Sequence, residues 1–458
     1  MARPPATRTL INSGTQTEWK PSQRERLIAG MVTAANRDGH AGATVSAVIE
    51  EAGVSRPTFY EYFEDRDHCF LAALGEAQAL LAERTAATVR DAAPEDAVAA
   101  SITALVELAR THPAEARFLT NEPLGAGRLA LGPRDGALEE TANLIEAAER
   151  DLPGTAVTPD VSTVILLGAV HRLVGNRLRR GDPSLTRVHG DLQDWVARYR
   201  QRRARQRWRS PLPGAAPKGK LPVFAPVLAQ AAPLPRGRPR LTAEEVAVNR
   251  RQRVLTAVAT LAQTHGYEQT TVADIARAAR VDTKVFYRLF KDKQDAFMSY
   301  HEHGFQQLMG AMAQAFFNAE EWPERAWRSG LAFMALLEAD PLIAHTGFVE
   351  AYSVGPRAIQ RVEDSHTAFT IFLQEGYRHT DDAGGGGPEP PGRLALEGIV
   401  AASFEIVYRQ VRAGRTQDLS RMLGQMGAFV LTPFLGPAEA NRFIARQLVK
   451  AKPRARRA

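Results

Sequence analysis

The sequence predicts an all-α fold made of two copies of one helical unit, with about nine helices in each half. Apolar residues recur at spacings of three and four along most of the chain, and the strict alternation typical of half-buried strands is absent. Residues 24–70 also align without a gap to residues 251–297, an offset of 251 − 24 = 227. A period of this length indicates a duplicated domain rather than a solenoid repeat.

Composition is consistent with two or more globular domains and restricts the chemistry. The chain has 458 residues, which is too long for one ordinary core, and carries a formal charge of +7. The excess of basic residues favours an anionic partner, although a solvated surface explains it equally well. Cys69 is the single cysteine, so no intramolecular disulfide and no cysteine metal cluster can form. No secretory signal or membrane-spanning run is present, so we expect a cytoplasmic protein without a membrane partner.

The first copy has the pattern of a three-helix unit. We expect its first helix over residues 22–37, ended by Gly39, and a second helix over residues 44–52. The segment Gly53-Val54-Ser55 predicts a tight turn, because glycine supplies the positive φ and serine caps the next helix, at residues 56–63. Two short helices joined in this way are typical of the helix-turn-helix, whose second helix enters the major groove of DNA.

The two aligned segments also resemble a known family. TVSAVIEEAGVSRPTFYEYFEDRDHCF (residues 44–70) and TVADIARAARVDTKVFYRLFKDKQDAF (residues 271–297) are similar to the DNA-binding signature of the TetR/AcrR repressors. In that family a threonine opens helix two, an Ala-Gly-Val-Ser turn follows, and an aromatic-Tyr pair with a later Phe and Lys closes the unit. The second copy departs at Arg280, which stands where the first copy has Gly53. A non-glycine residue with positive φ costs on the order of 1 kcal/mol, so Arg280 either recovers this by binding phosphate or leaves the second unit weaker.

The resemblance implies double-stranded DNA as the partner and assigns residues to it. Helix N-termini, tyrosine hydroxyls and the start of helix four should bind phosphate, while the exposed face of the recognition helix should contact bases. The phosphate-binding candidates are Thr44, Tyr60 and Arg66 in the first copy, and Thr271, Tyr287 and Lys293 in the second. The recognition-helix candidates are Ser55, Arg56 and Thr58 in the first copy, and Thr283 and Lys284 in the second. The alternatives are plain helix caps for the threonines, core packing for the tyrosines and a solvated helix start for Arg66 and Lys293. Because the two recognition segments differ, they would match a non-palindromic site.

The chain is expected to divide into six segments. They are the first helix-turn-helix domain (20–70), the first helical regulatory domain (71–205), a basic Pro-rich linker (206–245), the second helix-turn-helix domain (246–297), the second regulatory domain (298–447) and a basic tail (448–458). Within the linker, Arg236 and Arg238 resemble an AT-hook core, in which arginines lie along the minor groove of A·T-rich DNA. A solubilising linker without DNA contact is the alternative.

Two helices that are apolar on most of their circumference occupy equivalent places in the two halves. They span residues 161–181 and 393–414, and helices over 191–203 and 418–434 follow them. In the resembled family, the last two helices form a four-helix interface with a partner. Since this chain already carries two such units, we expect an intramolecular pseudo-dimer, with a conventional homodimer as the alternative.

The resemblance further implies a pocket for a small apolar effector inside each helical body, whose occupation releases the DNA. The candidate lining residues are Phe118, Leu119, Phe333, Met334, Phe348 and Tyr352, and for each of them plain core packing is the alternative. The abundant Phe and Met residues of the second half favour an apolar effector there.

Enzymatic activity and resident groups are not expected. The histidines of His301-Glu302-His303 lack the i, i+4 spacing of a helical zinc pair, and the chain contains no GxSxG, Walker or dinucleotide-binding motif. We therefore expect no catalytic residue, no metal and no cofactor. The sequence favours a sequence-specific transcriptional regulator, as a ligand-released repressor. An architectural DNA-binding protein without inducer is the alternative, and it would bind DNA weakly and without sequence preference.

Overall fold

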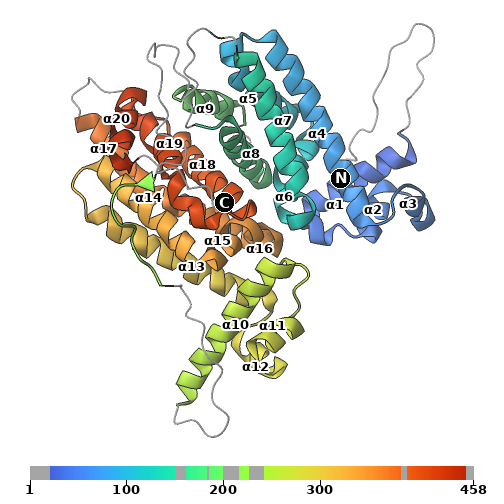
Figure 1. Ribbon diagram of the computed structural model, residues 1–458. Coiled ribbons are helices and arrows are strands. Elements are labelled where there is room, and N and C mark those ends of the chain that lie inside the picture. Colours follow the sequence, from blue (N-terminus) through green and yellow to red (C-terminus); the bar gives the residue numbers. More distant parts are fainter. Residues whose placement is uncertain are drawn as a thin grey trace, which may run out of the picture.

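The computed structural model describes residues 21–150, 152, 161–182, 185–199, 216–225, 242–382 and 389–449, and these residues are helical nearly throughout (Figure 1). The described part of the first half contains α1 (Gln23–Gly42), α2 (Val45–Ala52), α3 (Arg56–Tyr62), α4 (Arg66–Asp91), η1 (Pro94–Asp96), α5 (Ala97–Thr111), α6 (Pro113–Gly125), η2 (Gly127–Leu129), α7 (Leu131–Glu149), α8 (Thr163–Arg180) and α9 (Leu185–Ala197).

The second half repeats this order with additional short turns. Its described elements are α10 (Ala243–His265), α11 (Val272–Ala279), α12 (Thr283–Leu289), α13 (Lys293–Phe317), α14 (Trp322–Ala339), α15 (Pro341–His345), η3 (Thr346–Glu350), η4 (Ala351–Val354), α16 (Pro356–Phe369), α17 (Ile371–Asp382), α18 (Arg393–Arg412), η5 (Thr416–Met422), α19 (Leu423–Leu435) and α20 (Pro437–Gln447). The all-α prediction is therefore confirmed, with nine α-helices in the described first half and eleven in the second.

One small strand pair was not expected. Within the linker, β1 (Ala216–Pro217) pairs antiparallel with β2 (Leu448–Val449), the first two residues of the predicted basic tail. Lys218 N donates to the Gln447 carbonyl at 2.8 Å and extends the contact. The sequence showed no alternating pattern here because two residues are too few to display one.

Side-chain caps explain where the first helix of each half begins. Ser22 forms a capping box with Glu25 at the start of α1, and Thr242 forms the equivalent box with Glu245 at the start of α10. Gly39 interrupts α1 with φ 75°, at the position where the sequence predicted its end. The repeat seen in the sequence therefore extends to the caps of the first helix.

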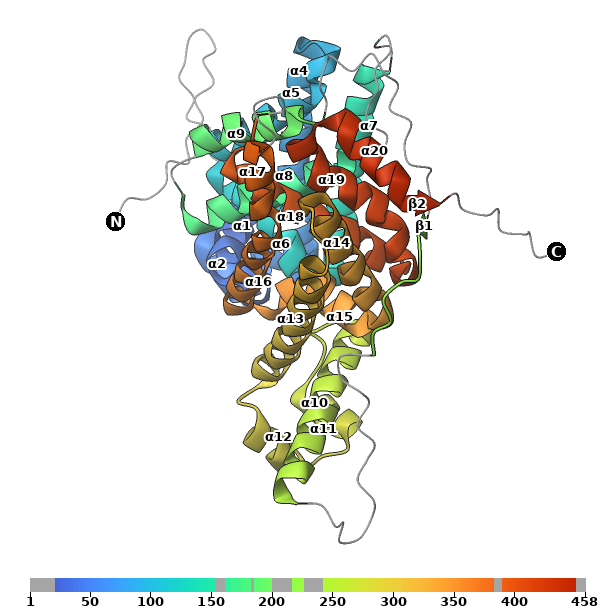
Figure 2. The same ribbon diagram turned by 90° about the vertical axis from the view of Figure 1, so that its left-hand side faces the viewer.

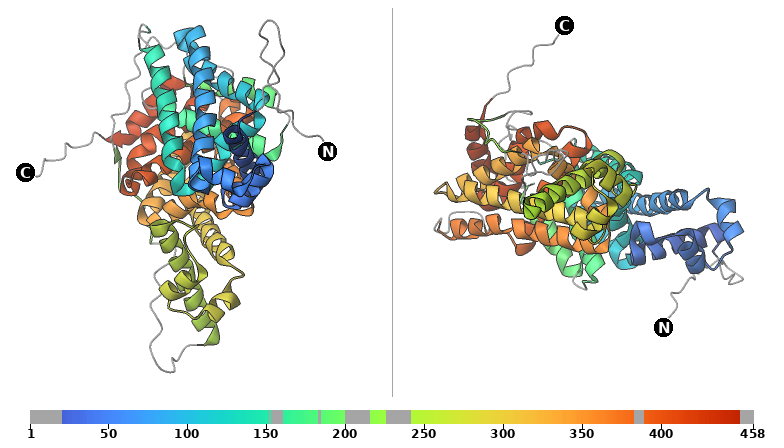
Figure 3. Two further views of the ribbon diagram at one scale, coloured as in Figure 1. Left: turned by 90° about the vertical axis from the view of Figure 1, so that its right-hand side faces the viewer. Right: turned by 90° about the horizontal axis from the view of Figure 1, so that it is seen from below.

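The two halves share one continuous apolar core, and their helix-turn-helix units project from it on different sides. In Figure 1, α1–α3 lie at the right of the body and α10–α12 at its lower end, and the turned views in Figures 2 and 3 show the second unit as a separate arm. α8 and α18 pack against each other in the middle, with α9 against α18. As predicted, α8 and α18 are buried on most of their circumference, whereas α9 begins at Leu185, earlier than residue 191.

Candidate nucleic-acid interface

Aromatic side chains form the core beneath each recognition helix. Phe59 of α3 is fully buried and Phe63 nearly so, with their rings 5.8 Å apart. Phe286 and Phe290 repeat this arrangement under α12, again at 5.8 Å. A helix of seven residues is not stable in isolation, so these rings fix its orientation against the first helix of each bundle.

The opposite face of α3 is open to solvent. Ser55 and Arg56 are exposed and Thr58 is half-buried, and the Ser55 hydroxyl caps the helix by accepting from Thr58 N at 3.2 Å. Tyr60 is 49% exposed, and the Arg56 guanidinium lies 6.0 Å from its ring centroid. The first-copy candidates therefore share one outward surface, which is the arrangement that base and phosphate contacts require.

The face of α12 is open in the same way. Thr283 and Lys284 are exposed, and Tyr287 is 57% exposed. Neither Tyr60 nor Tyr287 is packed in the core, which was the alternative for these residues. Each phenol ring instead stands edge-on against the phenylalanine that precedes it.

Both candidate threonines at the second helix of each bundle act as caps. Thr44 accepts from Ala47 N at 3.2 Å, and Thr271 forms a capping box with Asp274. The hydrogen bond from Thr271 is the main cause that lowers the pKa of Asp274 below its usual value. Both threonines are exposed, so capping leaves room for a phosphate contact, which stays a prediction.

The two candidates at the start of helix four already have protein partners. Arg66 pairs with Asp67 at 2.8 Å and donates to the His40 carbonyl at 3.4 Å. Lys293 Nζ donates to the carbonyls of Tyr267, Glu268 and Thr270 at 3.0–3.2 Å, and burial lowers its pKa. These contacts fix the loop after the first helix of each bundle, and sequence reasoning missed this role. Arg236 and Arg238 lie outside the described residues.

The turn of the second copy has the left-handed backbone conformation, which is strained for a non-glycine residue such as Arg280. Arg280 has φ 51° and is the one non-glycine residue with positive φ in the described chain, while Gly53 has φ 61° at the equivalent place. An arginine of the first helix holds each turn. Arg26 donates to the carbonyls of Ala52 and Gly53, and Arg253 to those of Ala279 and Arg280. Burial and the nearby Arg280 charge lower the pKa of Arg253.

Replacing Arg280 by glycine is therefore expected to stabilise the protein. The change relieves the left-handed strain and the repulsion with Arg253, and after the added chain entropy of glycine we expect a gain of about 0.5–1 kcal/mol. Thermal unfolding of the full chain measures this. The matched variant Gly53→Ala should shift the midpoint downward, and a lower midpoint for Arg280→Gly would contradict the strain argument.

The two helix-turn-helix units contact each other on the side that faces the helical body. His40 Nδ1 lies 3.2 Å from Glu268 Oε1, and His40 is 3% exposed. Arg128, on η2 of the first half, donates to the Gln263 carbonyl of α10, and Tyr267 N donates to Glu350 at 3.0 Å. The second helix-turn-helix unit is thus connected both to the other helices of the second half and to the first half of the chain.

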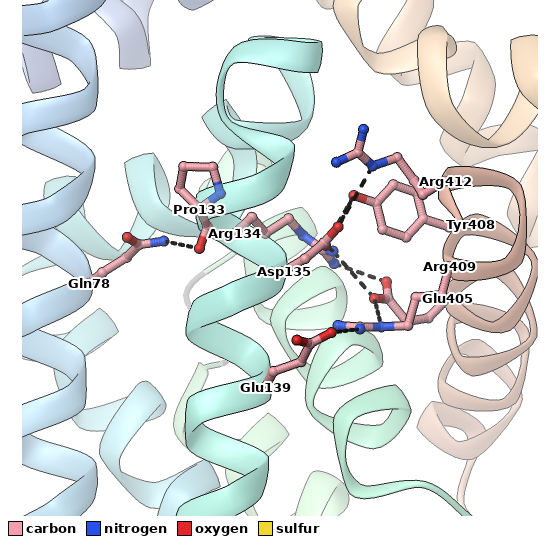
Figure 4. A network of polar contacts seen from close by, with 9 residues as sticks. All are labelled: Gln78, Pro133, Arg134, Asp135, Glu139, Glu405, Tyr408, Arg409 and Arg412. Carbon is pink, nitrogen blue, oxygen red and sulfur yellow. Dashed lines mark hydrogen bonds and ion pairs between the residues drawn. The ribbon is translucent and has the colours of Figure 1, made fainter. Parts of the chain in front are cut away.

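A buried ion network joins the two halves (Figure 4). Arg134 of α7 is bonded to Glu405 of α18 at 2.9 Å, with side-chain exposures of 9% and 0%. Arg409 holds the same carboxylate at 3.0 Å and reaches Glu139 at 2.9 Å. Burial by itself would raise the pKa of Glu405, but Arg134, together with Arg409 and Arg172, outweighs it and lowers the pKa. Glu405, in the middle of the apolar stretch of α18, was the available sequence signal for this network, and it went unused.

Close approach of the central helices depends on two glycines. A Cβ at Gly168 of α8 would lie 2.5 Å from Glu405 Cδ, and one at Gly398 of α18 would lie 2.6 Å from the Trp195 ring of α9. Tyr199, two residues beyond the end of α9, completes the contact by donating to the Phe429 carbonyl of α19 at 2.8 Å. These contacts bring the last helices of the two halves together within one chain, and whether they replace a contact between two chains stays a prediction.

The two bodies differ in internal space. In the first half, α4, α7 and α8 enclose an open cavity of about 640 Å³, with Gln78, Arg134 and His171 among its polar lining residues. Burial is the main cause that lowers the pKa of His171 to about 4. The two cavities described in the second half have volumes of about 30 and 60 Å³, because aromatic side chains fill that body.

The predicted pocket residues are distributed over these spaces. Leu119 lines the large cavity, Phe333 and Phe348 line the small ones, and Phe118 and Met334 are fully buried in the core. Tyr352 is buried and accepts a hydrogen bond from Arg172. Whether an effector touches any of them stays a prediction.

The geometry and composition of the described residues give little support to a metal site or a membrane span. No group of three or more potential metal ligands is found there. Within the same residues, no single helix has the length and apolar character needed to cross a membrane, and α14 with the segment after it meets those criteria only as a pair bent by 104°.

Both helix-turn-helix units match a known protein family. The model of the bacterial regulatory proteins, tetR family, matches residues 29–73 and again residues 254–308. No curated protein matches the chain significantly.

Three solved structures that match the chain each cover less than half of it. The fatty acid degradation regulator FadR from Bacillus halodurans is 20% identical, covers 40% of this chain and 94% of its own, and has a TM-score of 0.36. FadR from Bacillus subtilis, solved in complex with stearoyl-CoA, is 19% identical, with coverages of 39% and 97% and a TM-score of 0.36. The regulator SCO4942 from Streptomyces coelicolor is 21% identical, with coverages of 40% and 99% and a TM-score of 0.31.

Proposed function

Because the chain is a TetR-family DNA-binding regulator with two family units in tandem, we propose that one chain supplies both recognition helices to a single operator. The observation that carries the proposal is the combination of two outward-facing recognition helices with an interface satisfied inside the chain. α8 and α9 of the first half already pack on α18, and Tyr199 reaches the Phe429 carbonyl of α19, so these surfaces are in part covered without a partner chain.

The charges at the interface also favour pairing of unlike halves. The first half contributes Arg134, Arg177 and Arg179, which pair with Glu405, Glu397 and Glu363 of the second half. Two second halves placed together would leave the buried Glu363 without Arg179 and Arg180, and Glu405 would keep only Arg409 of its own helix. An unpaired buried charge costs several kcal/mol, so these pairs favour the intramolecular arrangement over a homodimer.

We further propose that the operator is non-palindromic. Arg56 and Thr58 occupy the exposed face of α3, whereas Thr283 and Lys284 occupy that of α12. An arginine can bind guanine through two hydrogen bonds, while a lysine makes a point contact. The two half-sites should therefore differ in sequence and lie about one helical turn of DNA apart.

Release by a ligand is assigned to the first half. Its cavity of about 640 Å³ falls within the usual range of small-molecule pockets, roughly 300–1,000 Å³, whereas the second-half cavities do not. α4 lines this cavity and follows directly on α3, so a ligand that displaces α4 also moves the first recognition helix. We propose that an occupied cavity lowers DNA affinity and that the protein is a repressor.

Footprinting on the DNA that flanks the coding region tests the proposal, with light scattering on the same sample. We expect one protected site with two unlike halves and a mass near 50 kDa, that of one chain. A mass near 100 kDa would refute the single-chain arrangement. Binding without a defined footprint, and with a steep salt dependence, would indicate the architectural alternative.

A further inference from the structure

A second cavity lies between the two halves, in a place that exists only when they are docked. It has a volume of about 250 Å³ and is lined by Arg172, Asn176 and Arg177 of α8 together with Glu363 and His366 of α16 and Glu397 of α18. It is separate from the effector cavity of the first half, which is lined by α4, α6, α7 and α8.

Arg172 is the unusual group in this wall. Its side chain is 6% exposed, and its one hydrogen bond to a described residue goes from Nη1 to the hydroxyl of Tyr352, a neutral group. Its Nε is buried without a hydrogen-bond partner, and no carboxylate of the described residues lies within ion-pair distance of it. Buried charges in proteins are normally paired, because an unpaired one costs several kcal/mol.

The neighbouring carboxylates are already taken by other arginines. Glu363 pairs with Arg179 and also with Arg180 at 3.5 Å, and Glu397 pairs with Arg177 at 3.0 Å. Glu405, whose pKa the Arg172 charge helps to lower, is bonded to Arg134 and Arg409. Each nearby acid therefore has its own partner, and the Arg172 Nε is left without a hydrogen-bond partner.

A second buried group on the same wall lacks a partner. His366 is 8% exposed and its Nε2 has no hydrogen bond among the described residues. Burial, with the nearby Arg172 charge, lowers its pKa well below the usual value, so the ring is neutral at pH 7 and can donate one hydrogen bond. Asn176, whose amide nitrogen comes within 2.7 Å of Glu363 Oε1 when the amide is turned by 180°, adds a polar side chain beside them.

We propose that this cavity binds a small oxyanion, a carboxylate or phosphate group, against Arg172 and His366. A guanidinium edge and an imidazole N–H are donors suited to such a group, and the anion would supply the charge that Arg172 lacks. The proposal rests on the docking of the two halves within one chain, and it adds to the function above a ligand that bridges them. Such a ligand would strengthen the docked arrangement, since it binds both halves at once.

Isothermal titration calorimetry on the full chain without DNA tests this site, with inorganic phosphate and succinate as separate probes and sodium chloride of equal ionic strength as the reference. We expect one site per chain for at least one probe, and the stronger probe identifies the source of the oxyanion. In Arg172→Met we expect binding to weaken at least tenfold, while Arg172→Lys retains part of it. The control Arg110→Met, an exposed arginine of α5, should bind as the wild type does.

Thermal unfolding separates a binding role from a structural one. Because Arg172 lacks an ionic partner in the unliganded chain, Arg172→Met should unfold at the same temperature as the wild type or higher, and it should lose the rise in Tm that the anion produces. Binding of neither probe, binding unchanged in Arg172→Met, or a large drop in the Tm of this variant would each overturn the proposal. Light scattering on the same samples reports the docking separately, and a footprint reports DNA binding, so failure of the anion site is distinct from failure of the regulator assignment.

Discussion

Glu405→Gln is expected to lower the free energy of unfolding by about 3–5 kcal/mol, the largest effect of any single change considered. The substitution keeps the shape of the side chain, which fits against Gly168, and removes only its charge. Arg134 then stays buried opposite a neutral amide, with Asp135 at 2.8 Å as its remaining acidic partner. The loss arises because Arg134 and Arg409 both lose the Glu405 carboxylate, and Asp135 alone does not compensate the buried positive charge.

Two further variants separate this cause from simple loss of a contact. Arg134→Met combined with Glu405→Gln removes both charges and should recover more than half of the loss. Glu397→Gln, on the same helix, removes a 48% exposed glutamate that pairs with Arg177, and should cost less than about 1 kcal/mol. Urea unfolding monitored by circular dichroism measures all three. If Glu405→Gln and Glu397→Gln cost the same, the buried network does not hold the halves together.

The helix-turn-helix units could be predicted closely from the sequence because their determinants are local. A glycine with positive φ, a capping serine and two phenylalanines four residues apart define a turn and a short helix within about a dozen residues. Gly39, Thr44 and Ser55 accordingly have the conformations expected of them. The roles of Arg66 and Lys293 were less accessible, since their carbonyl partners lie in a loop 23 to 26 residues earlier in the chain.

The contacts between the halves could not be predicted residue by residue. Arg134 and Glu405 are 271 positions apart, and no periodicity relates two side chains that meet only after both halves have folded. The size of the cavities in the second half could not be predicted from its aromatic residues either. Their number suggested a pocket, but Phe333, Phe348 and Phe369 pack on one another and leave little space. Composition identifies apolar residues, whereas cavity volume depends on how their shapes fit together.

On the DNA-binding faces, the exposed side chains predict that substitutions in the two recognition helices affect different half-sites of the operator. Arg56→Ala should weaken operator binding by about 1–3 kcal/mol, roughly tenfold to more than a hundredfold, and relax base preference in one half-site only. Lys284→Ala should act in the same way on the other half-site. Both side chains are exposed and lie outside the packed core, so neither change should alter the unfolding midpoint.

A substitution that removes a phosphate contact serves as the comparison for Arg56→Ala and Lys284→Ala, which remove base contacts. Tyr60→Phe removes one hydroxyl from a ring that is 49% exposed, and it should weaken binding to operator and unrelated DNA by the same factor. Affinities measured by fluorescence anisotropy, on operators mutated in one half-site at a time, distinguish the two patterns. If Arg56→Ala weakens binding to all sequences equally, Arg56 binds the backbone. If both Arg56→Ala and Lys284→Ala affect the same half-site, the two recognition helices belong to different chains on the DNA, and the single-chain arrangement is wrong. Unlike effects on opposite half-sites follow only if one chain spans the whole operator in a fixed orientation.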